Sequence, residues 1–258
     1  MANGFIFDLD GTVYLGNKLI AGAAETISHL RNRGDKVIFL TNKSIETVQN
    51  YVEKLNRLGI DTDYHEVINS NYLVARYLKS RLKQNEKVMV IGEQPLIDEL
   101  NDLNIAITDN SKEASYVVLG WDRQFTYEKL NNAFQAWRNG ARVIATNPDR
   151  TCPVEGGQVP DCGAMIGALE GATGEKVEII VGKPSTHAAH FIVSEILQLP
   201  PENCFIVGDR LATDMKMGLD YGLQAVLVLT GITNLGMVED SRMKPSVILD
   251  SIREVVDL

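Results

Sequence analysis

Short apolar runs alternate with amphipathic segments along the whole chain. Gly4–Leu9 and Lys36–Leu40 are apolar runs of strand length, and Ala23, Ile27 and Leu30 recur between them at helical spacing. Such runs are typical of buried strands, and the spacing between them places apolar residues on one face of a helix. Two buried strands joined by a helix form a βαβ unit, so the N-terminal part predicts a parallel sheet.

The same alternation continues towards the C-terminus. Apolar runs of strand length and periodic segments of helical length take turns, without an internal repeat or a long flexible linker. This order is typical of an α/β fold. Further strands are predicted at 87–92, 116–120, 142–146, 177–181, 204–207, 223–229 and 246–249, and further helices at 45–58, 95–103, 127–139 and 163–172.

Composition narrows the class of protein. The chain has 258 residues, of which 45% are hydrophobic and 23% charged, and this balance predicts an ordered fold of one large domain or two modest ones. The formal net charge of −9 disfavours nonspecific binding to nucleic acid or to an anionic membrane. A small anionic substrate would need locally concentrated positive charge.

The sequence carries no targeting or disulfide signal. No apolar run approaches the ~18 residues of a membrane span, and the N-terminus lacks the pattern of a signal peptide. The three cysteines, Cys152, Cys162 and Cys204, form no CxxC pair, so neither a disulfide framework nor a zinc site is indicated. A soluble protein of the reducing cytoplasm is expected.

Four predicted strands end in loops that carry polar and charged side chains. In parallel sheets, ligands collect at the carboxyl ends of the strands, where loops and helix N-termini converge. The four loops supply carboxylates, a hydroxyl group, an ammonium group and glycines. They are Asp8–Thr12, Thr41–Ser44, Gly182–Ser185 and Gly208–Asp214.

The acidic loops indicate a divalent cation. Asp8 and Asp10, two residues apart, would be costly to desolvate together without one. Magnesium prefers oxygen ligands and often binds through one or two carboxylates, which Asp8 and Asp209 can provide. An aspartate can also attack phosphorus, and a second can serve as general acid and base. Lys183 and Thr41 can stabilise charge on phosphoryl oxygens, so the pattern favours phosphoryl transfer.

Each of these residues also has an ordinary structural interpretation. Aspartates at strand ends favour turns and helix caps, Lys183 can be an exposed loop lysine, and Thr41 can simply end a strand. The coincidence of four such loops, each after an apolar run, argues against that interpretation. His187 and His190 lie three residues apart without a third ligand at suitable spacing, so a structural role is expected for both.

In these four loops the chain resembles the haloacid dehalogenase superfamily of phosphotransferases. The four signatures of that superfamily match in order as Asp8-Leu9-Asp10-Gly11-Thr12, Thr41, Lys183 and Gly208-Asp209-Arg210-Leu211-Ala212-Thr213-Asp214. The match spans nearly the whole chain. Similarity to the NagD and p-nitrophenylphosphatase-like branch is carried by Thr146-Asn147-Pro148-Asp149 and Gly182-Lys183-Pro184-Ser185.

The resemblance implies a role for each matching residue. Asp8 would be the nucleophile and a metal ligand, and Asp10 would be the general acid and base and would bind the metal through its backbone carbonyl group. Asp209 would be a further ligand, and Asp214 would orient the metal site. The cofactor would be Mg²⁺. The phosphate group would be held by Thr41, Asn42 and Lys183.

The resemblance also implies an α/β fold with a Rossmann-like parallel-sheet core and an inserted α/β cap domain. The core would comprise residues 1–74 and 179–258, and the large cap residues 75–178, with the active site between them. Asn147 and Asp149, at a strand end of the cap, are expected to contact the substrate. A homodimer formed through the cap is an alternative to a monomer that the sequence does not decide.

These features predict a magnesium-dependent phosphomonoesterase. It would act through an aspartyl-phosphate intermediate. Its substrates would be small phosphorylated metabolites, with sugar phosphates as the foremost expectation, and p-nitrophenyl phosphate. A phosphomutase or phosphotransferase, with an acceptor other than water, is the alternative within the family. A signalling module phosphorylated on aspartate is the alternative from another class, but such a module needs neither Asp10 nor a cap. Nucleic acid and membranes are not expected as partners.

Overall fold

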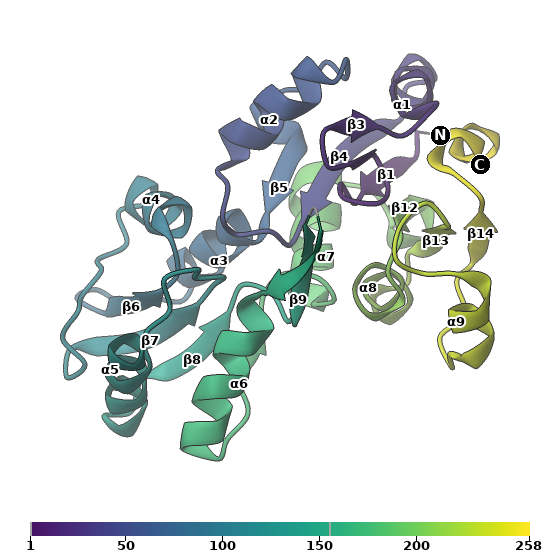
Figure 1. The fold of residues 1–258 in the computed structure, drawn as a ribbon. Coiled ribbons are helices and arrows are strands. Elements are labelled where there is room, and N and C mark those ends of the chain that lie inside the picture. Colours follow the sequence, from purple (N-terminus) through teal and green to yellow (C-terminus); the bar gives the residue numbers. More distant parts are fainter. Residues whose placement is uncertain (1, 155) are drawn as a thin grey trace. The chain divides into compact units, whose positions relative to one another are not determined.

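The chain folds into two compact units, which the computed structural model describes for residues 2–154 and 156–258 (Figure 1). The first, which we call the core unit, contains the residues up to Thr41, together with Val48–Ile68 and Lys183–Leu258. The second, the cap unit, contains Asn42–Thr47 and Asn69–Gly182. The chain therefore passes between the units four times.

A six-stranded sheet forms the centre of the core unit. Its strands are β1 (Gly4–Phe7), β4 (Lys36–Thr41), β5 (Val67–Asn69), β12 (Cys204–Gly208), β13 (Gln224–Val228) and β14 (Val247–Leu249), and a separate short hairpin pairs β2 (Tyr14–Leu15) with β3 (Lys18–Leu19). The order in the sheet is β14-β13-β12-β1-β4-β5. The apolar strand β1 is fully buried and pairs in parallel with β4 and β12, so Phe7 lies between Phe39 and Val207. The carboxyl ends of these three strands therefore meet.

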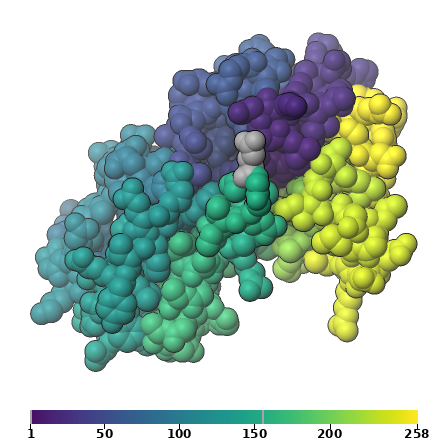
Figure 2. Space-filling view, in the orientation of Figure 1, coloured from purple at the N-terminus to yellow at the C-terminus, as the bar shows by residue number. Residues whose placement is uncertain are grey.

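Helices cover both faces of this sheet (Figure 1). The helices and helical turns of the core unit are α1 (Ala23–Asn32), α2 (Val48–Arg57), η1 (Tyr64–Glu66), α7 (Thr186–His190), η2 (Phe191–Leu197), η3 (Pro201–Asn203), η4 (Leu211–Met215), α8 (Lys216–Tyr221), α9 (Leu235–Asp240) and η5 (Ile252–Asp257). α1 packs against η5, and α7 packs against α8. Because α1 and η5 come from opposite ends of the chain, purple and yellow segments lie side by side in Figure 2.

The cap unit is built on a four-stranded parallel sheet. Its strands are β6 (Lys87–Ile91), β7 (Ala114–Leu119), β8 (Arg142–Ala145) and β11 (Ile179–Ile180), and its helices are α3 (Ser70–Lys79), α4 (Gln94–Asp102), α5 (Tyr127–Arg138) and α6 (Cys162–Thr173). The strand order is β11-β8-β7-β6, with α3 and α4 on one face and α5 and α6 on the other (Figure 1). An antiparallel hairpin of β9 (Thr151–Val154) and β10 (Gly157–Pro160) separates β8 from α6.

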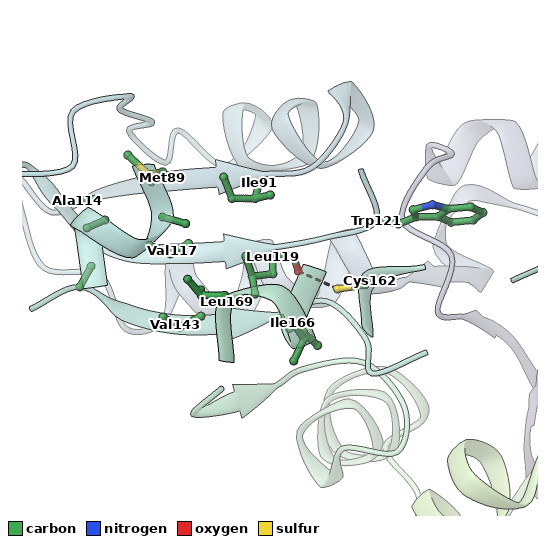
Figure 3. Close-up of a cluster of buried hydrophobic side chains, with 14 of the residues drawn as sticks. Met89, Ile91, Ala114, Val117, Leu119, Trp121, Val143, Cys162, Ile166 and Leu169 are labelled. Carbon is green, nitrogen blue, oxygen red and sulfur yellow. Dashed lines mark hydrogen bonds between the residues drawn. The ribbon is translucent and has the colours of Figure 1, made fainter. Parts of the chain in front are cut away.

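The cap unit has a hydrophobic core of its own, between its sheet and the helices α5 and α6. Val117, Leu119 and Val143 of the sheet are buried in one cluster with Ile166 of α6 (Figure 3). The Cys162 thiol points to this cluster and donates a hydrogen bond to Leu119 O (3.4 Å). A separate core is the property that defines a domain. The predicted α/β class, with a parallel-sheet core and an inserted α/β cap, is therefore confirmed.

The boundaries between the units differ from the predicted ones. Residues 69–74 and 179–182 group with the cap unit, so the cap neither begins at 75 nor ends at 178. One reason is that α3 packs against α4. Three consecutive side chains also hold the segment Asn42–Thr47 to the start of α3. Their hydrogen bonds run from Asn69 Nδ2 to Glu46 O (2.9 Å), from Ser70 Oγ to Asn42 O (2.7 Å) and from Asn71 Nδ2 to Ser44 O (2.9 Å).

Candidate active site

The nucleophile predicted from the sequence lies at the carboxyl end of β1. Asp8 directly follows this strand and is only 8% exposed, and its backbone N–H donates to Val207 O (2.9 Å). Asp8 Oδ1 accepts a hydrogen bond from Lys183 Nζ (2.5 Å). Lys183 Nζ also donates to Leu40 O (3.2 Å), directly before Thr41 at the end of β4. One ammonium group thus joins the ends of β1 and β4.

Three carboxylates meet around this ammonium group. Asp8, Asp209 and Asp214 each offer an oxygen atom, and these atoms lie within 4.8 Å of one another. Asp209 follows β12, and Asp214 lies in η4, with its Oδ1 2.6 Å from Lys183 Nζ. All four side chains are buried. When every carboxylate is ionised, one positive charge faces three negative charges, so the cluster favours a further cation.

Backbone groups fix the position of Asp214. Arg210 N–H donates a hydrogen bond to Asp214 Oδ2 (3.1 Å). A side chain at Gly208 would overlap the Asp214 carboxylate, so the close approach of the two residues requires glycine. Because Asp214 interacts with Lys183 through one oxygen and with Arg210 through the other, its carboxylate is suited to orient its neighbours.

Burial sets the protonation of this cluster when no cation is bound. It raises the pKa of Asp8 to about 8, while Lys183 lowers that pKa and the Asp214 and Asp209 carboxylates raise it further. Burial, followed by Asp214, also raises the pKa of Asp209 to about 6. Burial alone would lower the pKa of Lys183, but the Asp214 and Asp8 carboxylates raise it above its ordinary value. Lys183 therefore stays charged, whereas full ionisation of Asp8 at neutral pH needs a further cation.

The orientation of Asp209 leaves one carboxylate oxygen for a metal ion. Asp209 Oδ2 accepts a hydrogen bond from Ile232 N–H (2.6 Å). Asp209 Oδ1 is buried and has no hydrogen-bond partner among the residues that the structure describes. An unpartnered buried carboxylate oxygen is costly, and Mg²⁺ prefers oxygen ligands. Asp8 and Asp209 therefore fit a Mg²⁺ ion, with Asp214 beside them.

Asp10 lies on a tight turn that directly follows Asp8. Leu9 O accepts hydrogen bonds from the N–H groups of Thr12 (3.2 Å), Val13 (2.9 Å) and Tyr14 (3.2 Å). Gly11 has a φ of 91°, a conformation that glycine adopts at little cost. The Asp10 side chain is half-buried on this fixed backbone. A carboxyl group in this setting can exchange protons with a ligand at the strand ends.

We expect magnesium to stabilise the protein more strongly at pH 8 than at pH 6. On folding, the pKa of Asp8 rises from 3.8 to about 8 and that of Asp209 rises to about 6. The metal-free protein therefore loses the corresponding stability as the pH rises from 3.8 towards about 8. Mg²⁺ binds ionised carboxylates and so competes with protons.

Thermal unfolding in EDTA and in excess MgCl₂ at the two pH values measures this effect. The increase in Tm caused by magnesium should be larger at pH 8. An increase that is equal at both pH values, or larger at pH 6, contradicts the assignment of Asp8 and Asp209 as ligands that lose protons on binding.

The two cap residues predicted to contact the substrate belong to a hydrogen-bond network within the cap unit. Asn147 is 0% exposed, and its Nδ2 donates to Asp149 Oδ2 (3.0 Å) and to Asp161 Oδ1 (3.2 Å). Asn42 Nδ2 donates to the same Asp149 oxygen (2.7 Å). The Asn42 amide, predicted to hold phosphate, is thus engaged within the cap unit. Of the two predicted contact residues, only Asp149, which is half-buried, has side-chain surface to offer.

Other features of the described residues add no second site. Burial raises the pKa of the Cys162 thiol to about 12 and that of the Cys204 thiol to about 11, so both stay protonated and are poor nucleophiles. His190 Nδ1 lies 3.0 Å from the Tyr221 hydroxyl oxygen, which is an ordinary surface contact. Within residues 2–154 and 156–258, no helix has the length and apolar character needed to cross a membrane.

The loop after β13, Thr230–Thr233, also contacts the acidic residues, although it is not among the loops predicted from the sequence. Thr230 Oγ1 donates to Gly11 O (2.6 Å), and Ile232 N–H binds Asp209 as described above. The loop has no charged side chain, so a search for carboxylates and lysines does not find it. Its place directly after a buried strand, at the carboxyl end of the sheet, is the signal that could have found it.

Known protein families match both segments of the chain that contribute residues to this site. The family model for haloacid dehalogenase-like hydrolases matches residues 5–106, and a HAD-hydrolase-like model matches residues 180–255. The sugar-phosphatase AraL of Bacillus subtilis is 41% identical over 99% of this chain and 92% of its own length. An acid sugar phosphatase of Staphylococcus epidermidis is 36% identical over 94% of this chain and 92% of its own length. The two matched segments contain all four signature loops.

Solved structures share the fold over nearly the whole chain. A 4-nitrophenylphosphatase from Thermotoga maritima has a TM-score of 0.94 at 33% identity, over 100% of this chain and 97% of its own. NagD from E. coli K-12 has a TM-score of 0.89 at 32% identity, over 98% of both chains. A glycerol phosphate phosphatase from Mycobacterium tuberculosis, in complex with magnesium, has a TM-score of 0.90 at 27% identity, over 98% of this chain and 76% of its own.

Proposed function

We propose that this chain, which belongs to the haloacid dehalogenase-like hydrolase family, is a magnesium-dependent phosphomonoesterase that hydrolyses sugar phosphates. The predicted family and phosphatase activity are confirmed by relatives that are named phosphatases. The names sugar-phosphatase and acid sugar phosphatase support the substrate class. The observation that carries the chemistry is the buried cluster of Asp8, Asp209 and Asp214 around Lys183.

In the first step of the proposed mechanism, Asp8 attacks the phosphorus atom of the substrate. A P–O bond forms to a carboxylate oxygen of Asp8 as the bond to the leaving oxygen breaks, and an aspartyl-phosphate results. Asp10, in its protonated form, gives its proton to the leaving sugar oxygen. When bound at Asp8 and Asp209, a Mg²⁺ ion supplies positive charge that favours ionised Asp8 and offsets the charge of the phosphoryl group.

In the second step, water attacks the phosphorus atom of the aspartyl-phosphate. Asp10, now a carboxylate, takes a proton from the water, and the P–O bond to Asp8 breaks. Inorganic phosphate leaves, and Asp8 is restored. Thr41, at the end of β4, and Lys183, whose Nζ donates to the neighbouring Leu40 O, would bind the phosphoryl oxygens in both steps. Asp214 keeps the Lys183 ammonium group in place through the ion pair of 2.6 Å.

Substrate selection is assigned to the cap unit. Asp149 is the candidate for contact with the leaving group, because its carboxylate is half-buried and is fixed by the amides of Asn42 and Asn147. Asn147 is assigned a positioning role, because its side chain is buried. A fixed carboxylate accepts hydrogen bonds from hydroxyl groups, which a sugar offers in number. Asn42 is assigned to the phosphate group on the family resemblance alone.

A phosphate-release screen tests the proposed function. The panel compares sugar phosphates with nucleotides, phosphoglycolate, glycerol phosphate and pyridoxal phosphate, each in magnesium and in EDTA. Sugar phosphates should be preferred by at least about tenfold in kcat/KM, which is about 1.4 kcal/mol of transition-state binding, and EDTA should remove the activity. A preference for another class contradicts the substrate assignment. A second phosphorylated product without free phosphate favours a phosphotransferase instead.

We expect Asp10→Asn to distinguish good leaving groups from poor ones. An amide cannot donate the proton that a sugar alkoxide needs, whereas p-nitrophenolate leaves readily without one. With a sugar phosphate, kcat should fall about 10²–10⁴-fold. With p-nitrophenyl phosphate, a burst of p-nitrophenol from the first step should persist in stopped-flow measurements. Loss of that burst in proportion to the loss with the sugar phosphate contradicts the role of Asp10 as acid.

A further inference from the structure

The loop Thr230–Thr233, which we call the β13 loop, joins the two acidic loops of the core unit. Thr230 Oγ1 donates to Gly11 O (2.6 Å), in the turn that carries Asp10. Ile232 N–H donates to Asp209 Oδ2 (2.6 Å), and Thr233 N–H donates to Asp209 O (3.2 Å). Three hydrogen bonds thus connect this loop to the turn after β1 and to the residue after β12.

The bond from Ile232 determines which oxygen of Asp209 is offered to a ligand. A carboxylate can rotate about its Cβ–Cγ bond, but a hydrogen bond to one oxygen holds it in one orientation. Here Oδ2 is bound, while Oδ1 is buried without a hydrogen-bond partner among the described residues. The backbone of the β13 loop therefore orients the carboxylate that fits the metal ion.

Gly231 provides the space in which this carboxylate lies. A Cβ atom added to Gly231 would overlap Asp209 Oδ2 and would lie 2.6 Å from Asp209 Cβ. Gly231 does not have a positive φ, so the need for glycine is one of space. On the other side, a Cβ atom at Gly11 would lie 2.6 Å from the same oxygen and 3.1 Å from Gly231 Cα. Two glycines thus flank one buried carboxylate, which cannot move away without leaving Ile232.

We propose that the β13 loop is a positioning element for the metal site, in which Thr230 and Gly231 are the decisive residues. Thr230 ties the loop to the turn that carries Asp10, and Gly231 lets Asp209 reach the N–H of Ile232. Both are proposed as positioning residues that act through Gly11 and Asp209, not as ligands of the metal. This inference rests on the proposed function, because it concerns the affinity of the same site for Mg²⁺.

Magnesium affinity of the purified protein, measured by calorimetry, tests the role of Thr230. Thr230→Val keeps the shape of the side chain and removes the donor to Gly11, whereas Thr230→Ser keeps the hydroxyl group. Loss of a hydrogen-bond partner of a metal ligand typically lowers metal affinity about 10–100-fold, and Thr230, which supports the loop of that partner rather than the ligand itself, belongs at the lower end of this range. We expect a loss of about tenfold for Thr230→Val, with Thr230→Ser close to the wild-type protein. A Thr230→Val affinity equal to that of the wild type overturns the proposal for Thr230.

Gly231→Ala tests the role of space at the carboxylate. We expect magnesium affinity to fall about 10–100-fold. The decrease in Tm that the substitution causes should be smaller in EDTA than in magnesium. Gly236→Ala, in the following helix α9, is the matched control, because its added Cβ would meet nothing closer than Asn234 Oδ1 at 3.4 Å. If Gly231→Ala does not fold, the valine and serine variants of Thr230 decide the proposal. Wild-type affinity in Gly231→Ala overturns the proposal for Gly231.

The variant Asp209→Asn distinguishes failure of this inference from failure of the proposed function. If Asp209→Asn binds magnesium as the wild type does, the metal assignment itself is wrong, and the inference falls with it. If Asp209→Asn loses binding while Thr230→Val and Gly231→Ala keep it, the metal assignment stands and the positioning role of the β13 loop is rejected.

Discussion

Asp8→Asn is expected to abolish turnover while the fold is kept. An amide cannot attack phosphorus, so no aspartyl-phosphate forms and kcat should fall about 10⁴-fold or more. The substitution also removes one of three carboxylates around Lys183. Because burial raises the pKa of Asp8 to about 8, this carboxyl group is largely protonated in EDTA at neutral pH, and an amide of the same shape replaces a neutral group. The free energy of unfolding in EDTA should therefore not decrease. Phosphate release with magnesium and urea denaturation measure the two effects.

The matched control for this prediction is Asp109→Asn, the same change at an exposed aspartate of the cap unit. It should leave kcat and the free energy of unfolding close to those of the wild type. Undiminished magnesium-dependent hydrolysis of p-nitrophenyl phosphate by Asp8→Asn rules out Asp8 as the nucleophile.

Lys183→Met is expected to cause the largest loss of stability among the substitutions considered for this site. The Lys183 side chain is buried and is paired with Asp8 at 2.5 Å and with Asp214 at 2.6 Å. Removing one partner of a buried ion pair leaves an uncompensated charge and typically costs about 3–5 kcal/mol. Urea denaturation in EDTA measures the loss. Activity should fall as well, because a cation that faces the phosphoryl oxygens is removed.

Two further variants control this prediction. Lys216→Met breaks an exposed pair with Asp220, whose side chains are 46% and 44% exposed, and should cost less than about 1 kcal/mol. The double variant Lys183→Met/Asp214→Asn should recover part of the lost stability, because it removes one of the charges left unpaired. A cost for Lys183→Met no larger than that for Lys216→Met contradicts a buried, charged cluster.

The acidic cluster could be predicted from the sequence because its members lie beside strand ends. Asp8 and Asp209 directly follow apolar runs, and Thr41 ends a third. Parallel pairing of β1 with β4 and β12 brings these three ends together. Lys183 could be included because it also follows an apolar run, although its hydrogen bonds to Asp8 and Leu40 required the structure.

Contacts that depend on backbone groups could not be predicted in this way. Ile232 contacts Asp209 through its backbone N–H group, and Gly231 leaves space for the Asp209 carboxylate because it has no side chain. Neither residue type indicates a contact with Asp209. The bond between Asn42 and Asp149 joins residues 107 positions apart. Asn42 belongs to the same unit as Asp149 only because the segment Asn42–Thr47 groups with the cap unit, which the hydrophobic pattern does not indicate.

The hydrophobic pattern also missed or misplaced some elements. The predicted helix at 45–58 begins only at Val48. The residues before it belong to the segment Asn42–Thr47, in which Ser44 O and Glu46 O accept hydrogen bonds from the side chains of Asn71 and Asn69. No helix is predicted at α3, although Asn69 is a residue type that favours helix N-termini and its side chain caps this helix by accepting a hydrogen bond from Tyr72 N–H. The segment 148–160, in which no strand is predicted, contains the hairpin β9–β10, because its glycines and prolines obscure the alternation of a strand.

Chemical mapping of the phosphoryl group is the most direct test of the central claim. Rapid mixing with a sugar phosphate and magnesium, acid quenching within one turnover and peptide mass analysis locate any covalent phosphoryl adduct. The account predicts an adduct on Asp8 that forms as fast as the first turnover and is absent in Asp8→Asn and in EDTA. Phosphate release at the full rate with no adduct on Asp8, or with an adduct on another residue, contradicts it.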